Sequence, residues 1–319
     1  MSISDDLPAY TDLPKAEGNV GSAWGLFGTD DSLGLMNLLS PAKVLEAVKL
    51  VRKGAVFPLD LPIDYINPPL FGRGATTHFT HGEGPSLGLD DKLDNYHLQS
   101  GSQWDSLGHV GFKADEYYNG ATTEEVRSGG RNTIEHIASR GIVARGILLD
   151  VADIVAERGG PGESVAITVD DLESARQRAG VEIRAGDVLL VHSGYVEWHR
   201  EQPLEVRTAQ ADGFNIQAAG LAHGEEMVEY LWNLHVSAVV SDTAGFEVWP
   251  VEDGPGADPF GFLHTVLIGQ FGMMLGELWQ LGDLARDCQA DSVYEFLLVS
   301  APLNVTNGIG SPANAVAIK

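Results

Sequence analysis

Apolar runs alternate with amphipathic segments through the second half of the chain, and this pattern predicts strands and helices in turn. The expected strands are residues 147–151, 187–194, 236–241 and 294–302, and the expected helices are residues 168–179, 221–234 and 262–271. Thr168 or Asp170 can cap the first of these helices, and Gly180 can end it. Because the two element types alternate, we expect a layered α/β fold.

The first half of the chain shows fewer such signals. Ser40 and Pro41 suit the start of a helix over residues 42–53, and Gly54 suits its end. A strand over residues 56–61, a Gly- and Pro-rich loop at 82–88 and a short helix at 132–139 are also expected. No repeat or low-complexity linker divides the chain. We therefore expect one domain over residues 21–319, after a flexible or extended segment of residues 1–20.

Polar side chains occupy alternate positions in the stretch from Gln99 to His109. In an extended chain, Gln99, Gln103 and Asp105 would share one face with His109. A straight strand would separate the two glutamines by roughly 13 Å, so one metal ion could contact both only if the chain bends. Gly101 between them permits such a bend. The pattern indicates either a metal-binding face or a polar strand edge.

His264 and Glu277 form a second candidate pair. On one continuous helix, their separation would place them about 140° apart around the axis, too far to share a metal ion. Gly272 lies between them and makes a continuous helix unfavourable. A helix that ends near Gly272, followed by extended chain, could bring both side chains to one point. Alternatively, Glu277 pairs with a neighbour such as Arg286.

Composition narrows the classes of partner. The formal net charge is −25, and this argues against nucleic acid and anionic membrane surfaces, which bind basic patches. Cys288 is the single cysteine, so no intrachain disulfide can form. The amino terminus lacks the basic and apolar regions of a signal peptide, and no apolar run has the length of a membrane span. We expect a cytoplasmic protein that acts on a small molecule.

The stretch from residue 99 to 109 resembles the signature of the "putative cyclase" family, which includes bacterial kynurenine formamidase and isatin hydrolase. That signature runs His-x-Gly-Thr-His-x-Asp-x-Pro-x-His. Gly101, Ser102, Asp105 and His109 match it or nearly match it, whereas Gln99 and Gln103 replace its two metal-binding histidines and Leu107 replaces its proline. Further similarity to the longer members of the family lies at residues 24–25, 29–34, 37–41, 246–250 and 264–277.

The resemblance implies the family's swivelling β/β/α fold and a divalent metal ion. The ligands it implies are Gln99, Gln103, Asp105, His264 and Glu277. Because most of these donors are oxygens, we expect Mn²⁺ first, with Zn²⁺ or Mg²⁺ as alternatives. The resemblance also assigns His109 the role of moving protons and places the region of Trp24 over the active site. The other aromatic candidates for the pocket wall are Phe27, Phe71 and Trp104. Members of the family are usually homodimers or homotetramers.

Together these features predict a metal-dependent hydrolase. Its substrate would be an amide, a lactam or a related carbonyl compound with a cyclic or aromatic group. His109 would act as base and then as acid, which suits the ordinary imidazole pKa. A cyclase or lyase could use the same metal and base, so the sequence leaves that alternative open. The two glutamines leave a third alternative, in which the protein binds a small molecule without catalysis.

Overall fold

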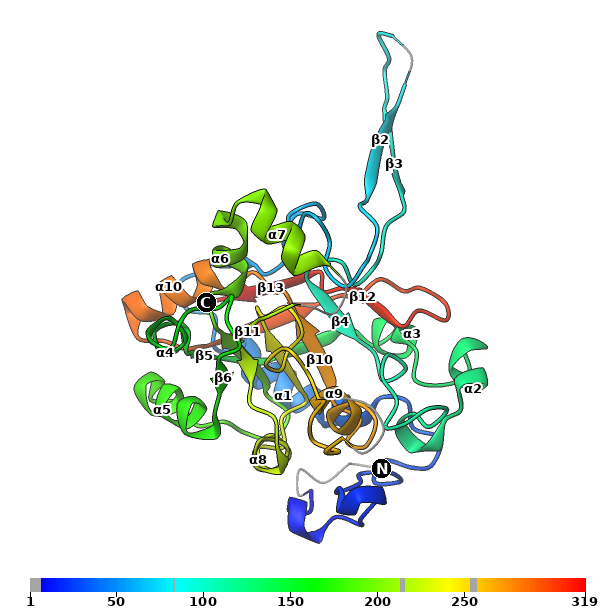
Figure 1. Cartoon of the computed structure of the whole chain (residues 1–319), viewed down its shortest axis with the longest axis vertical. Coiled ribbons are helices and arrows are strands. Elements are labelled where there is room, and N and C mark those ends of the chain that lie inside the picture. Colours follow the sequence, from blue (N-terminus) through cyan, green and yellow to red (C-terminus); the bar gives the residue numbers. More distant parts are fainter. Residues whose placement is uncertain (1–6, 83, 213–215, 253–256) are drawn as a thin grey trace.

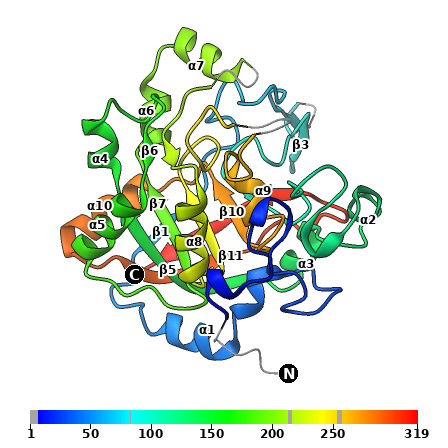
Figure 2. The same ribbon diagram turned by 60° about the horizontal axis from the view of Figure 1, so that its bottom comes forward.

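A computed structural model describes residues 7–82, 84–212, 216–252 and 257–319. A nine-stranded mixed sheet with the strand order β1-β13-β11-β5-β7-β9-β10-β4-β12 runs through the body (Figures 1 and 2). Its strands are β1 (Val56–Pro58), β4 (Gln103–Asp105), β5 (Ile142–Asp150), β7 (Val188–His192), β9 (Ala238–Ser241), β10 (Met274–Glu277), β11 (Glu295–Ser300), β12 (Gly310–Pro312) and β13 (Ala315–Ile318). Helices surround the sheet, so the expected α/β architecture is confirmed.

The centre of the sheet is parallel and its flanks are antiparallel. β5, β7, β9 and β10 run in the same direction, and β4 then pairs antiparallel with β10. Parallel strands are covered on both faces, and β7 is buried along its whole length. The carboxyl ends of the parallel strands meet at one edge, the usual place for a site in such a sheet. His192 ends β7, Asp242 follows β9 and Glu277 ends β10 at this edge.

Helices pack on this sheet from several parts of the chain. α1 (Pro41–Val48) packs on β5 and β11, α5 (Val169–Ala179) packs on β5, and α8 (Glu225–Asn233) contacts both α5 and α9 (Leu263–Leu267). The remaining helices are α2 (Thr123–Arg127), α3 (Ile134–Ala138), α4 (Ala152–Glu157), α6 (Tyr195–Glu201), α7 (Leu204–Ala211) and α10 (Gly282–Asp291). The described residues also form two short paired strands, β6 (Ala166–Ile167) and β8 (Gly220–Leu221). They further form the 3₁₀ turns η1 (Tyr10–Asp12), η2 (Glu17–Asn19), η3 (Gly34–Leu38) and η4 (Tyr118–Gly120). None of the described helices is both long and apolar enough to cross a membrane.

Several predicted elements are confirmed, and comparing their predicted and observed ends shows where local capping residues set the end and where strand pairing does. α5 begins after Thr168, whose side chain forms a reciprocal capping box with Asp171, and it ends at Gly180 in the left-handed conformation. α1 has the expected Ser40 cap but ends at Val48. α8 begins four residues later than predicted, because residue 221 pairs in β8 instead.

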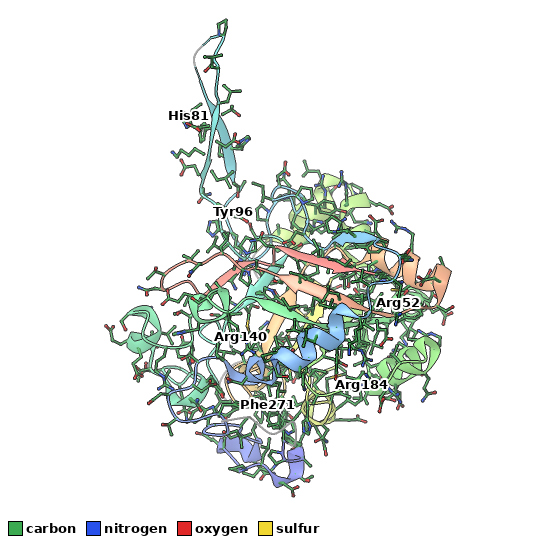
Figure 3. The ribbon with its side chains drawn as sticks, turned by 180° about the vertical axis from the view of Figure 1, so that it is seen from behind. Arg52, His81, Tyr96, Arg140, Arg184 and Phe271 are labelled. Carbon is green, nitrogen blue, oxygen red and sulfur yellow. The ribbon has the colours of Figure 1, made fainter. Side chains whose placement is uncertain are left out.

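An exposed arm leaves the body between β1 and β4. β2 (Thr77–His81) and β3 (Asp90–Asp94) form this two-stranded arm, and every residue of both strands is exposed. Figures 1 and 3 show it projecting away from the sheet, with His81 on it. The loop expected at 82–88 is its tip, of which residue 83 lies outside the described residues.

The amino-terminal segment packs on the body from residue 7 onward. Tyr10 and Leu13 are almost fully buried, and the backbone N–H of Tyr10 donates to Oδ1 of Asn233 in α8 at 2.9 Å. Residues 1–6 of the expected flexible or extended segment lie outside the described residues. The rest of that segment therefore belongs to the packed structure.

Trp104 belongs to the core. It is fully buried, its ring contacts Trp279 edge-on at 4.9 Å, and its Nε1 donates to Ser300 at 2.9 Å. Successive residues of a strand point to opposite faces, so Trp104 lies on the opposite face of β4 from Asp105. Its expected place in a substrate pocket is therefore wrong.

Candidate metal and catalytic site

The register between β4 and β10 brings the first site residues together. Gln103 lies directly opposite Glu277 in this antiparallel pair, and its Nε2 donates to Glu277 Oε2 at 2.5 Å. Asp105 lies two residues further along β4 and therefore shares the face of Gln103. Asp105 is fully buried and Glu277 is 4 % exposed. Two buried carboxyl groups thus lie on one face at the edge of the sheet.

His264 reaches the same point from α9. Its Nε2 lies 3.1 Å from Glu277 Oε1 and 3.8 Å from Asp105 Oδ2. α9 ends at Leu267, and the chain is extended again in β10, so the predicted break between His264 and Glu277 is confirmed. The convergence of the two side chains is observed, and the alternative partner Arg286 contacts Asp283 instead.

Glu247 fixes the orientation of the His264 ring through a hydrogen bond at Nδ1. His264 Nδ1 donates to Glu247 Oε2 at 2.7 Å, and Glu247 is fully buried. A carboxylate on one ring nitrogen of a histidine fixes the orientation of the ring and directs the other nitrogen toward a metal. Here that other nitrogen faces Asp105 and Glu277.

Burial and neighbouring charges set the protonation of this cluster. Burial, and then the charge of Asp105, raise the pKa of Glu277 to about 7. Burial works to raise the pKa of Asp105 too, but its interactions with the imidazoles of His109 and His264 lower it overall. Burial would lower the pKa of His264, but Glu247, Asp105 and Glu277 together raise it well above its ordinary value. The cluster therefore holds protons near neutral pH that a cation can replace.

The donor set fits a divalent metal ion. One ligand atom each from Asp105, His264 and Glu277 lies within 4.8 Å of the others. Asp105 Oδ2 and Gln103 Oε1 are buried, and neither has a hydrogen-bond partner among the described residues. Buried polar atoms are rarely left unpaired in native proteins. Oxygen donors with one imidazole suit Mn²⁺ or Mg²⁺, and Zn²⁺ also binds such ligands.

The two glutamines take different positions around these carboxylates. The chain turns and bends over residues 98–102, so Gln99 precedes β4 and the bend predicted around Gly101 is confirmed. Gln99 Nε2 donates to Asp105 Oδ1 and lies 3.2 Å from His109 Nδ1. In this arrangement both glutamines donate amide hydrogens to the carboxylates. Their role as metal ligands remains a prediction.

His109 lies beside the cluster rather than within it. It follows β4 in a turn, and its Nε2 is 3.7 Å from Asp105 Oδ1. Its side chain is 26 % exposed and lines a cavity. Burial lowers the pKa of His109, so the ring is neutral at pH 7 and can accept a proton.

A cavity of about 260 Å³ opens onto this site. It is lined by Phe71, Arg73, His109, Gly245, Trp249, Phe262, His264 and Glu277. Phe71 and Trp249 contact each other with their ring centres 5.1 Å apart, and the Phe262 ring lies 5.0 Å from that of His264. Of the aromatic residues predicted for the pocket, Phe71 lines the cavity. Trp24 instead donates from Nε1 to the Gly269 carbonyl at 2.8 Å, and Phe27 packs against the core.

Four of the residues that shape the site carried no assignment from the sequence: Arg73, Glu247, Trp249 and Phe262. The segment 246–250 was marked by its family resemblance, which was the available signal for Glu247 and Trp249. Arg73 lies two residues after Phe71, and Phe262 lies two residues before His264, so their closeness to predicted site residues was the available signal for them.

A second acidic cluster with an imidazole lies along the same sheet edge. His192, Glu197 and Asp242 also place ligand atoms within 4.8 Å of one another. Asp242 already accepts from the backbone N–H groups of Ser193, Gly194 and Tyr195, which occupies both its oxygens. We therefore assign this cluster to the structure of the β7–α6 turn rather than to a metal.

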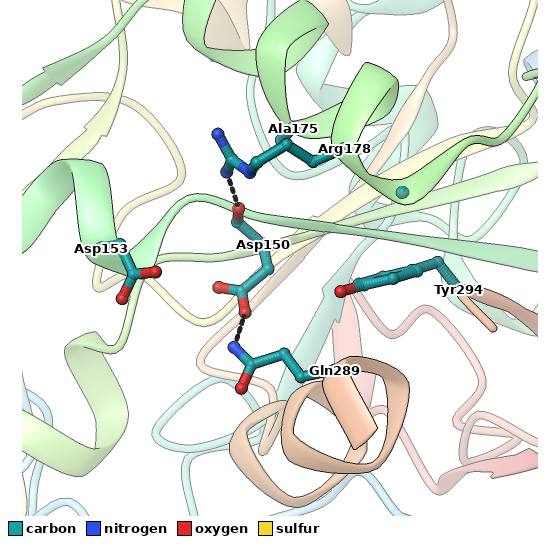
Figure 4. Close-up of a pocket in the computed structure, with 7 residues that line it drawn as sticks. Asp150, Asp153, Ala175, Arg178, Gln289 and Tyr294 are labelled. Carbon is teal, nitrogen blue, oxygen red and sulfur yellow. Dashed lines mark hydrogen bonds between the residues drawn. The ribbon is translucent and has the colours of Figure 1, made fainter. Parts of the chain in front are cut away.

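The pocket beside this cluster is lined by Arg178 and Gln289, which both hydrogen-bond to Asp150 (Figure 4). Asp150 accepts from His192 Nδ1 at 2.9 Å and from Gln289 Nε2 at 2.7 Å, and Arg178 donates to its carbonyl at 2.8 Å. The polar groups at Asp150 thus satisfy one another. This pocket of about 250 Å³ offers no comparable set of unpaired donors.

Comparisons with known proteins identify relatives of the whole fold. A family model described as putative cyclase matches residues 29–248, which include Gln99, His109 and Glu247. A crystal structure of a novel cyclase superposes with a TM-score of 0.81 at 29 % identity, over 93 % of this chain and 99 % of that one. A search of curated proteins found no sequence match.

Two isatin hydrolases share the fold at lower identity. Isatin hydrolase A from Ralstonia solanacearum has a TM-score of 0.59 at 21 % identity, over 88 % of this chain and 98 % of that one. Isatin hydrolase A from Labrenzia aggregata, bound to benzyl benzoate, has a TM-score of 0.60 at 16 % identity, over 85 % of this chain and 94 % of that one.

Metal affinity is predicted to rise with pH. Glu277, with a pKa of about 7, and His264, with a raised pKa, hold protons that a metal ion must displace. Each displaced proton makes the dissociation constant for Mn²⁺ fall about tenfold per pH unit. Competition with a fluorescent chelator at pH 6, 7 and 8 measures this slope. A dissociation constant that does not change with pH would contradict the proposed ligands.

The free energy of unfolding is predicted to depend on pH because of His192. Burial would lower its pKa, but hydrogen bonds with Asp150 and Glu197 and the charge of Asp242 raise it to about 10. The stabilisation is therefore complete below the unfolded pKa of about 6.5 and is lost as the pH rises toward 10. Urea unfolding should show that His192→Gln costs several kcal/mol at pH 6.5 and much less at pH 9.5.

His199 supplies the matched control for this measurement. It is also buried, but burial lowers its pKa to about 4, so it stays neutral across the same range. The stability lost in His199→Gln should not change between pH 6.5 and 9.5. An equally constant loss in His192→Gln would show that His192 is not charged in the folded protein.

Proposed function

The chain belongs to the putative cyclase family, and we propose that it is a metal-dependent hydrolase. It cleaves an amide, lactam or related carbonyl bond of a small cyclic or aromatic substrate. The observation that carries this proposal is the buried convergence of Asp105 with His264 and Glu277, the last two of which line an aromatic cavity. The buried oxygens Asp105 Oδ2 and Gln103 Oε1, which have no hydrogen-bond partner among the described residues, support a bound cation.

Asp105, His264 and Glu277 would hold the metal ion, with Gln103 and Gln99 as further oxygen donors. Mn²⁺ is the favoured ion because oxygen donors predominate. When bound there, such an ion polarises a carbonyl group and lowers the pKa of water. Glu247 keeps Nε2 of His264 directed at the same point through its bond to Nδ1.

His109 moves the protons in this proposal. Its neutral ring accepts a proton from the attacking water as the new C–O bond forms, and it returns that proton to the leaving nitrogen as the C–N bond breaks. Gln99 lies at Nδ1. With its amide oxygen turned toward Nδ1, Gln99 accepts a hydrogen bond from the Nδ1–H group, and the lone pair of His109 Nε2 is then the one that accepts protons.

The aromatic walls select the substrate's shape. Phe71, Trp249 and Phe262 line the cavity above the floor residues. Its volume of about 260 Å³ is below the range of roughly 300–1,000 Å³ for drug-sized ligands, which favours a substrate with one ring system. Such a ring would stack on the side chains while its carbonyl reaches the floor.

A second candidate is a small-molecule binder without catalysis. The observation that favours it is the bonding of Gln99 and Gln103, whose amides already donate to Asp105 and Glu277. Amide hydrogens supply part of the positive charge that these carboxylates need. This function predicts purified protein that takes up neither Mn²⁺ nor Zn²⁺.

Substitutions at the site are predicted to distinguish the residues that hold the metal from the residue that moves protons. With formanilide as substrate and Mn²⁺ present, His109→Gln should bind metal as well as the unchanged protein but lose about 10²–10⁴-fold in kcat. Asp105→Asn should lose both metal, measured by plasma mass spectrometry, and activity. His78→Gln on the exposed arm and Asp64→Asn on the surface are the matched controls and should change neither. Unchanged kcat in His109→Gln would contradict the mechanism.

A further inference from the structure

Arg73 stands at the mouth of the cavity. It is half-buried in the loop that precedes the arm, and it lines the same cavity as His109, His264 and Glu277. Its guanidinium lies over the Phe71 ring, 5.3 Å from the ring centre. His264 and Glu277 are almost fully buried, so they form the floor, whereas Phe71 and Arg73 are partly exposed and form the entrance.

The guanidinium of Arg73 has no anionic partner within the described part of the chain. Its ring contact with Phe71 is the interaction seen for the side chain, and no carboxylate forms an ion pair with it. A planar guanidinium with free N–H groups offers paired hydrogen bonds to a carboxylate.

The charge of Arg73 acts on the floor of the cavity. Burial is the largest influence on the pKa of Asp105, His109 and Glu277, and the positive charge of Arg73 is a smaller influence that lowers all three. The charge therefore lies close enough to act through the cavity. Most of the chain's net negative charge lies on the surface, where salt screens it within about 8 Å. An anion inside the cavity interacts mainly with these local groups.

We propose that the substrate carries a carboxylate on its ring and that Arg73 binds this carboxylate at the mouth of the cavity. For the reacting end of the substrate, this inference rests on the proposed hydrolase function. The ring then lies among Phe71, Trp249 and Phe262, and the amide reaches the floor at His264 and Glu277. The substrate class is a monocyclic aromatic amide with an acidic group, such as an acylaminobenzoate. Arg73 is a specificity residue in this scheme and takes no part in bond cleavage.

The placement of the floor carboxylates supports this assignment over a purely structural role for Arg73. Asp105 accepts from Gln99, and Glu277 accepts from Gln103 and contacts His264. These groups are thus partnered from within the site. No hydrogen bond or ion pair joins the Arg73 side chain to either of them among the described residues, where its contact is with the ring of Phe71.

The test compares carboxylates with their neutral esters. The binding probes are the three isomeric carbamoylbenzoates and their methyl esters, titrated against the full chain by ligand-observed NMR. The turnover probes are the three formamidobenzoates and their methyl esters, with Mn²⁺ present. The three isomers differ in the distance between the carboxylate and the amide group on the ring. The variants are Arg73→Gln, Arg73→Lys and the control Arg52→Gln, which removes the same charge from an exposed position (Figure 3).

We expect at least one carboxylate to bind tenfold or more tightly than its ester to the unchanged protein and to Arg52→Gln. The preference should fall below twofold in Arg73→Gln and be intermediate in Arg73→Lys, because an ammonium keeps the charge but not the planar fork. In turnover, the same loss should appear as a raised KM with little change in kcat. The melting temperature should not change, since the side chain makes no hydrogen bond within the described residues.

Two results would overturn the inference. The first is the absence of any carboxylate preference in the unchanged protein across all three isomers. The second is a preference that persists in Arg73→Gln. A preference that depends on Arg73 without hydrolysis of any formamidobenzoate would instead overturn the proposed hydrolase and leave anion recognition by Arg73 in place. The two claims therefore fail separately.

Discussion

The arrangement of the site depends on two carboxyl groups that are buried side by side at the β4–β10 pairing. Burying Asp105 and Glu277 next to each other costs free energy unless positive charge or hydrogen bonds compensate. The structure supplies that compensation from several elements: an imidazole from α9, an amide from β4 and a second amide from the bend before it. Each of these partners requires the sheet register and the position of α9 to be correct. The site and the fold are therefore specified together.

The two glutamines give this site its individual chemistry. An amide can donate or accept, depending on which way it is turned. As donors, Gln99 and Gln103 neutralise part of the carboxylate charge. Turned about, they present oxygens to the same point. A cation therefore competes with the amide hydrogens for Asp105 and Glu277, in addition to displacing protons. This competition should make the metal more weakly held than in a site whose ligands are already free of hydrogen bonds.

Local sequence signals correctly predicted those helices and strands whose first and last residues are determined within the segment itself. α5 has its capping box and its terminal glycine within the segment, and β7 is a continuous apolar run, so both could be predicted. The start of α8 was mispredicted, because residue 221 pairs in β8 with a distant part of the chain. The exposed arm also followed no apolar pattern, since it has no buried face to produce one.

The same distinction holds for the site. The bend around Gly101 and the break near Gly272 are local, so the approach of Gln99 to Asp105 and of His264 to Glu277 could be anticipated. Arg73, Trp249 and Phe262 reach the cavity only through the tertiary fold. Trp104 was wrongly assigned to the pocket wall, because the alternation of residues separates it from Asp105 but does not show that its own face is buried in the core.

The most direct test of the central claim is anomalous diffraction at the manganese edge from crystals soaked in Mn²⁺ near pH 8. One strong anomalous peak is expected between Asp105, His264 and Glu277, with the Gln103 amide oxygen turned toward it. A structure without a peak at this point, or with a peak only at His192, Glu197 and Asp242, would contradict the claim.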